Sequence, residues 1–392
     1  MVAIVIAVSC VIAGVVCATQ LDRRIAERNA ILDRSEPFAY AAQNLYAALS
    51  AADAAAATSF LSGGIETGEM RARYQRALAD AAAALADTTA GATEPETRTA
   101  VAEIAAQLAA YTGLVEAARA NNRQGFPIGS AYLREASALM QTRLLPGAER
   151  IYTANLAAVD EEQGAVGSVP VLALVLLVGV LVVVAAGSVV MYRRTNRQFN
   201  VGLLVSAAVV LLVIGWVVVA TRMAANDIEH SRTEGTARFS DLAKARILTQ
   251  QARTDETLQL ISRGDVTAGE KSFYGHIDEL LDELGTDEPA VADGVASWTA
   301  SHQKQVAAYT GGDYATAVAQ AIGTDPAAST AHVAVVESQL RDGIEQSRAT
   351  LRDHVSAAGA SLVWSPTGTL VLMVLAAAAA VFGLWPRLKE FL

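Results

Sequence analysis

The chain has 392 residues and a net charge of −10, and 53% of its residues are hydrophobic. The length alone would suit two or three soluble domains, but the hydrophobic residues gather in long uncharged runs, which excludes an ordinary soluble protein. The two cysteines, Cys10 and Cys17, both lie in the first of these runs, which excludes a disulfide framework elsewhere in the chain.

Four runs contain no Asp, Glu, Lys, Arg or His and are long enough to cross a bilayer, which takes about 20 helical residues. They are Val2–Thr19, Val169–Tyr192, Val201–Thr221 and Pro366–Trp385. Buried core helices rarely combine such length with a complete lack of charge. We therefore predict four transmembrane helices, at 1–19, 168–192, 201–221 and 365–386.

Basic residues decide the predicted orientation. The loop 193–200 between the second and third spans has no acidic residue. Together with the tail 387–392, it carries five basic residues: Arg193, Arg194, Arg197, Arg387 and Lys389. Positive charge marks cytoplasmic segments, so we expect a multi-pass protein of the plasma membrane with both termini in the cytoplasm. The chain begins directly in the first span, which leaves an upstream start open. The same five residues are the candidate docking surface for a cytoplasmic partner.

This orientation places two modules outside the membrane, at 20–167 and 222–364. Their net charges of −5 and −9 do not suit nucleic-acid or anionic-lipid binding. Ala, Leu, Glu, Gln and Arg dominate both modules, which favours helices. In the first module we predict helices Leu21–Ser62, Glu66–Asp87, Glu96–Ala120 and Ser130–Val166. In the second we predict Arg222–Arg263, Thr267–Leu284, Pro289–Tyr309, Tyr314–Ile322 and Pro326–Leu362.

Short loops between long helices favour antiparallel four-helix bundles. Each half of the chain runs span, helical module, span, and a proline, Pro170 or Pro366, stands where each module re-enters the membrane. The fold class is therefore all-α, with four transmembrane helices and two extracytoplasmic four-helix bundles arranged as a tandem duplication.

The last helix of the second module carries the clearest periodic pattern. Residues spaced three or four apart form an eleven-residue repeat, which keeps an apolar stripe nearly straight. The stripe consists of Val333, Val336, Leu340, Ile344, Ser347, Leu351, Val355, Ala358 and Leu362. Because this long, straight helix runs into the fourth span, we interpret it as a mechanical rod.

Catalytic and cofactor motifs are absent from the sequence: there is no phosphate-binding glycine loop, no HExxH, no CxxC and no nucleophile elbow. We therefore expect neither an enzyme nor a bound cofactor. All five histidines lie in the second module, with no metal-site spacing, and are interpreted as ordinary surface or core residues, with a metal or pH-sensing role as the alternative. The acid-rich stretch Asp278–Glu288 is interpreted as a solvated helix end, with calcium binding as its alternative.

The loops expected at the membrane-distal ends of the bundles are candidate contact sites for a ligand or protein partner. Exposed aromatic residues beside glycines often occur in recognition loops. In the first module the candidates are Asn121, Asn122, Arg123 and Phe126. In the second they are Arg263, Asp265, Tyr309, Asp313 and Tyr314.

Several stretches resemble one family. "SAADAAAATSFLSGG", "YTGLVEAARANNRQGFPIGSAYLREASALM", "ARTDETLQLISRGD" and "GLWPRLKEF" look like the GlnX-type four-span membrane proteins of actinobacteria. The resemblance implies action beside a lipid-anchored solute-binding protein of the GlnH type, which binds acidic amino acids outside the cell. It implies the Ser/Thr protein kinase PknG as the cytoplasmic output. The modules also resemble the four-helix sensor domains of chemoreceptors, although no cytoplasmic signalling coiled coil is present.

Three functions follow from this organisation. The sequence favours a non-catalytic transmembrane signal transducer, because nearly all of its polar mass lies in the outer modules. Alternatives are an accessory component of a transport system and a structural envelope protein. The spans contain no ionisable residue, and ion or proton pathways usually need one, which argues against transport. Homodimerisation stays open.

Overall fold

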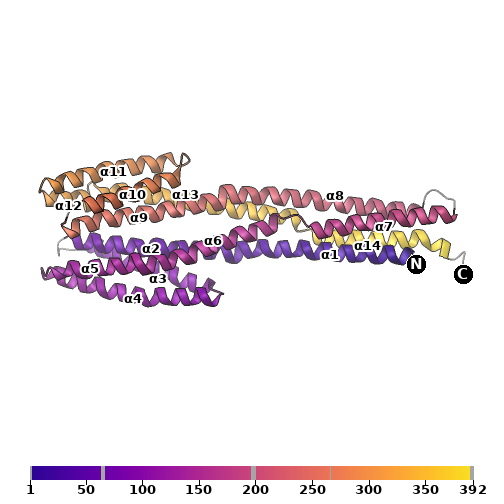
Figure 1. The fold of residues 1–392 in the computed structure, drawn as a ribbon, viewed down its shortest axis with the longest axis horizontal. Coiled ribbons are helices and arrows are strands. Elements are labelled where there is room, and N and C mark those ends of the chain that lie inside the picture. Colours follow the sequence, from indigo (N-terminus) through magenta and orange to yellow (C-terminus); the bar gives the residue numbers. More distant parts are fainter. Residues whose placement is uncertain (1, 63–66, 196–199, 265, 389–392) are drawn as a thin grey trace. The chain divides into compact units, whose positions relative to one another are not determined.

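The structure, a computed structural model, describes residues 2–62, 67–195, 200–264 and 266–388 (Figure 1). The described residues form helices and no strand, which confirms the predicted all-α class. The first half contains α1 (Val2–Ala30), η1 (Ile31–Ser35), α2 (Glu36–Leu61), α3 (Gly68–Gly91), α4 (Pro95–Arg123), α5 (Ile128–Leu139), η2 (Met140–Leu144), α6 (Leu145–Gly167) and α7 (Val171–Thr195).

The second half contains α8 (Val201–His230), η3 (Ser231–Ala237), α9 (Arg238–Ser262), α10 (Thr267–Leu284), α11 (Pro289–Thr310), α12 (Tyr314–Ile322), α13 (Ser329–Leu362) and α14 (Ser365–Leu388). The segments η1, η2 and η3 are π-helical, whereas the sequence predicted uninterrupted α-helices there. Two of these segments stand just before a proline, Pro37 after η1 and Pro146 after η2, and a proline removes one i→i−4 hydrogen bond of a helix.

The chain divides into two compact units. We call Met1–Asp33, Val159–Glu234 and Thr350–Leu392 the span unit, and Arg34–Ala158 and Gly235–Ala349 the bundle unit. The span unit therefore includes flanking segments that the sequence analysis assigned to the outer modules, among them 20–33 and 222–234.

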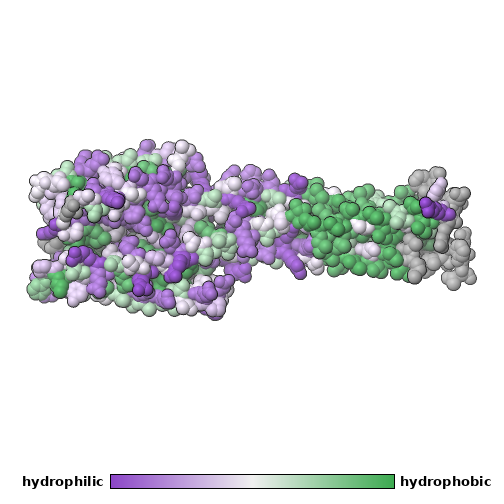
Figure 2. Space-filling model, in the orientation of Figure 1, coloured by the Kyte–Doolittle hydropathy of each residue, from purple (hydrophilic) through white to green (hydrophobic). Residues whose placement is uncertain are grey.

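Four helices among the described residues are long and apolar enough to cross a membrane, as predicted. They are Ala3–Leu61, Ile128–Arg193, Val201–Ser262 and Ser329–Leu384. On the face of the span unit shown in Figure 2, hydrophobic residues form a continuous surface. In this unit, large apolar side chains such as Val175, Leu212 and Leu375 are more than half exposed. This exposure suits contact with lipid and indicates a multi-pass membrane protein.

Inside the span unit, α14 packs against both α1 and α8, and α7 also packs against both. At one close approach, Gly202 of α8 lies against Gly383 of α14. A Cβ atom on Gly202 would lie 2.4 Å from the Gly383 Cα, so only glycine fits there. Asn200 caps α8 by accepting from Gly202 N–H at 3.0 Å and donates to Gly383 O at 2.9 Å. Small residues thus allow close helix contact, as is common in membranes.

The bundle unit has one core to which both modules contribute. In the first module α2 packs against α3 and α4 against α5, and in the second α9 packs against α10 and α11 against α12. Helices α2 and α9 also pack against each other, and Gln251 Nε2 donates to the Tyr46 hydroxyl at 3.0 Å across that contact. The two modules therefore share a packed interface.

The apolar stripe on α13 is buried. All nine of its residues are buried, with Val333 the most exposed at 8%. Ser347, the only polar member, satisfies its hydroxyl by donating to Ile344 O at 3.0 Å. The stripe can therefore carry one serine without leaving a buried polar group unpaired.

Candidate functional site

In the first module, the predicted recognition residues begin inside a helix. Asn121, Asn122 and Arg123 form the last turn of α4 rather than a loop. Asn122 Nδ2 donates to Phe60 O at 2.9 Å, which ties the end of α4 to α2. Gly125 has a φ of 71°, a left-handed conformation that glycine adopts without strain. The turn leaves Phe126 52% exposed, so this aromatic ring is available for contact.

In the second module, the structure brings three of the predicted residues together. The Arg263 guanidinium lies 4.5 Å from the centre of the Tyr314 ring, and Tyr309 packs edge-to-face on Tyr314. The Tyr309 hydroxyl donates to Gly264 O and the Tyr314 hydroxyl to Leu260 O, both at 3.1 Å. These two hydrogen bonds attach the α11–α12 loop to the end of α9. Both rings are half-buried rather than freely exposed.

Asp313 is the N-cap residue of α12. Its side chain caps α12 by accepting from Thr316 N–H at 3.0 Å and from the Thr316 hydroxyl at 2.7 Å, and these bonds lower the pKa of its carboxyl. Asp265 lies outside the described residues. The loops that carry the two predicted sets, between α4 and α5 and between α11 and α12, lie at the same end of the bundle unit (Figure 1).

Of the candidate cytoplasmic residues, the structure describes Arg193 as exposed near the end of α7. The backbones of Arg194 and Arg387 are helical, but their side chains lie outside the described part of the structure, as do Arg197 and Lys389 entirely. Their docking role therefore stays a prediction.

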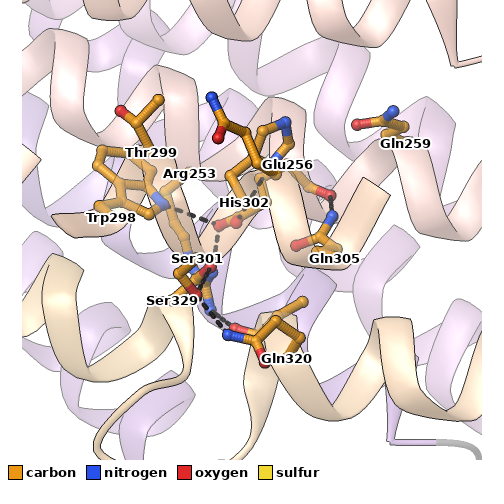
Figure 3. Close-up of polar contacts among 12 residues, drawn as sticks. Arg253, Glu256, Gln259, Trp298, Thr299, Ser301, His302, Gln305, Gln320 and Ser329 are labelled. Carbon is orange, nitrogen blue, oxygen red and sulfur yellow. Dashed lines mark hydrogen bonds and ion pairs between the residues drawn. The ribbon is translucent and has the colours of Figure 1, made fainter. Parts of the chain in front are cut away.

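Sequence reasoning missed a buried ion network in the second module (Figure 3). Glu256 of α9 is fully buried, and its carboxylate accepts from Arg253 Nη1 at 2.5 Å and from Trp298 Nε1 at 3.2 Å. Arg253 also donates to Ala321 O at 3.0 Å and to the Thr330 hydroxyl at 2.9 Å. A buried carboxylate is tolerated because it is paired and hydrogen-bonded on every side.

His302 of α11 extends the network towards the surface. Its side chain is fully buried, with Nδ1 3.3 Å from Glu256 Oε1 and Nε2 2.8 Å from Glu270 Oε1. Its ring stacks on Phe273 with centroids 3.8 Å apart. Because Glu270 is 25% exposed, the chain of contacts leads from the core to solvent. Protonated imidazole would donate to both carboxylates.

Burial and charge act in opposite directions on this network. Burial disfavours the charged His302, but the hydrogen bond to and the negative charge of Glu256, together with Glu270, outweigh it and raise the His302 pKa. Burial also disfavours the Glu256 carboxylate, but Arg253 and His302 outweigh it and lower the Glu256 pKa. The network therefore favours the charged form of each group relative to the same side chain in water.

The first module buries a carboxyl without a cation. Asp53 of α2 is 1% exposed and accepts from the Ser137 hydroxyl at 2.8 Å and the Tyr111 hydroxyl at 3.2 Å. Burial raises its pKa to about 6, although these hydrogen bonds oppose the shift. The two modules thus treat a buried acid oppositely, because only the second supplies a counter-charge.

Two sequence signals could have found these residues. Asp53 interrupts the alanine-rich run "SAADAAAA", where the neighbouring positions are apolar, and Arg253 precedes Glu256 by three residues, the spacing of neighbours on a helix. The partners His302 and Trp298 come from another helix, and only the fold identifies them. Among the described residues, no group of three or more His, Cys, Asp or Glu could hold a metal ion.

The comparisons with known proteins single out the first module. Residues 27–164 match the family model described as actinobacterial sensor domain. This match covers about a third of the chain, from the end of α1 through most of α6, and supports an actinobacterial sensor protein. No curated protein and no solved structure matches the chain. The matched segment contains the α4–α5 turn and the buried Asp53.

Proposed function

We propose that the protein is a non-catalytic transmembrane signal transducer. The observation that carries the proposal is the continuity between span and sensor domain. The helix Ala3–Leu61 contains the first candidate span and also enters the matched sensor domain at residue 27. Small helix shifts of about 1–2 Å are a known way to transmit such signals.

The signal that we propose is an extracytoplasmic nutrient, namely acidic amino acids presented by a solute-binding lipoprotein of the GlnH type. This choice follows from the resemblance to GlnX-type proteins. The α4–α5 turn supports it as a contact site, because Phe126 and Ile128 are both more than half exposed beside Arg123. Aromatic residues and arginine are enriched at protein interfaces.

The output that we propose is a cytoplasmic Ser/Thr protein kinase of the PknG type. The surface offered to it is the loop with Arg193, Arg194 and Arg197 and the tail with Arg387 and Lys389, with both termini in the cytoplasm. Basic short loops favour this orientation in the plasma membrane.

The two modules are proposed to be tandem copies of one unit. The π-helical segments η1 and η3 support this, because they begin 200 residues apart, at Ile31 and Ser231, on the helices that leave the first and third candidate spans. Their shared position would follow from duplication of one helix that already contained the irregular turn.

The deciding experiment compares cells with and without the protein during a shift from aspartate or glutamate to a neutral nitrogen source. Quantitative phosphoproteomics should show substrates of the kinase changing in the first strain only. A response that is unchanged by deletion would overturn the proposal. In that case, solute flux in vesicles reconstituted with the protein would favour a transport component. A lack of flux would favour a structural envelope protein.

A further inference from the structure

A second polar site lies in the sensor domain, in a cavity of about 260 Å³ between α4 and the helix that runs through η2 into α6. Glu103 and Gln107 line it from α4, and Arg143 and Arg150 line it from the opposite helix. Drug-sized ligands occupy pockets of about 300–1,000 Å³, so the volume suits a smaller metabolite. All of these residues fall within 27–164, the segment matched by the sensor family.

The π-helical segment η2 contributes Thr142 and Arg143 to the lining of this cavity. Leu145 N–H donates to Met140 O, the i→i−5 bond of a π-helix. The next residue, Pro146, has no N–H, so one carbonyl of the preceding turn lacks its helical donor. At Gly147 a Cβ would lie 3.2 Å from Ile104 Cγ1, which shows how closely α6 approaches α4 beneath the cavity. Single π-turns inside α-helices frequently occur at functional sites.

The charged side chains that line the cavity form no ion pair with other described residues. Glu103, Arg143 and Arg150 are exposed, and no ion pair joins any of them to another described residue. Arg150 Nε donates to Pro146 O at 3.3 Å, which leaves the terminal guanidinium nitrogens free to bind another group. The cavity thus presents two cations and one anion, a net charge of +1.

We propose that this cavity binds an acidic amino acid directly. Arg143 and Arg150 bind the two carboxylates, and Glu103 binds the ammonium group. Planar guanidinium groups match carboxylates through paired charge-assisted hydrogen bonds. Glu103 repels a dicarboxylate that lacks the ammonium group, which provides specificity. The inference rests on the proposed sensing function and deepens it, because it places the ligand on the sensor domain itself.

Calorimetric titration of the purified full-length protein in detergent tests the site. Aspartate and glutamate should bind saturably, and glutarate and lysine should not. R143Q and R150Q should each weaken binding by about 10- to 100-fold, the loss of one charged hydrogen-bonded pair. E103Q should weaken aspartate and glutamate but admit glutarate. R134Q is the matched control, because Arg134 is exposed on α5 outside the cavity, and it should leave the affinity unchanged.

Lack of saturable binding by the wild-type protein, or equal weakening by R143Q and R134Q, would overturn the inference. Far-ultraviolet circular dichroism verifies that each variant is folded. If R143Q fails to fold, R143K replaces it, and its loss should again exceed that of R134K. If aspartate and glutamate do not bind the purified protein but the phosphorylation response in cells still depends on it, the direct binding site is refuted and the proposed relay is not. Binding without any phosphorylation response would refute the relay and leave the site standing.

Discussion

Replacement of Arg253 by methionine should strongly destabilise the bundle unit. Methionine keeps most of the apolar stem but removes the cation 2.5 Å from the Glu256 carboxylate, which is fully buried. Removal of one partner of a buried ion pair costs about 3–5 kcal/mol, because the remaining charge is buried without compensation. For a domain of 150–250 residues, each kcal/mol shifts the melting temperature by roughly 2–4 °C. The expected loss is therefore roughly 6–20 °C.

Thermal unfolding of the full-length protein in detergent, followed by circular dichroism, measures this loss. R238M is the matched control, because Arg238 lies on the same helix and pairs with Glu288, and both side chains reach solvent, at 44% and 20% exposed. Exposed pairs contribute about 1 kcal/mol or less. The double variant R253M/E256Q removes both charges while Gln can still accept from Trp298, so it should recover part of the loss. Equal melting temperatures for R253M and R238M would refute this reasoning.

Three further predictions concern pH and packing. The raised pKa of Asp53 means that its contribution to stability is present below pH 3.8 and is lost as the pH rises through about 6, so D53N should abolish a decline of about 3 kcal/mol in a stability–pH profile. The pKa of His302 is also raised, so the stability that His302 contributes is present below pH 6.5 and is lost as the pH rises through its folded pKa. H302N should remove this pH dependence. An unchanged stability–pH profile in H302N would contradict the prediction. G202V should lower the melting temperature because Gly383 blocks a side chain there, whereas G215V, which meets no atom within 4 Å, should not.

The helix boundaries were largely readable from the sequence because turn residues mark them. Thr267–Leu284 and Tyr314–Ile322 were predicted with the bounds that α10 and α12 have. Gly285 follows the first with a φ of 55°, and Asp313 caps the second. These signals act within a few residues, so they need no knowledge of the fold.

The candidate site was only partly predictable. The recognition residues were expected in open loops, but Asn122 instead donates to the backbone of α2 and Tyr309 to the backbone of Gly264, just after α9. The ion network joins residues up to 77 positions apart, such as Arg253 and Thr330, and no local pattern links them. The contact between α2 and α9 was also missed. Its signal is the alanine-rich sequence of α2, which is buried on nearly every side.

The π-helical segments determine how a one-residue deletion would affect the packing of the helices that contain them. An α-helix turns by about 100° for each residue, and a π-turn accommodates one residue more than the α-helical register allows. The unit boundaries after Asp33 and Glu234 fall inside η1 and η3. Deletion of one residue from η1 would let the helix become regular without changing the phase of the side chains on either side. The same deletion a few turns away would rotate every following residue off its packing face.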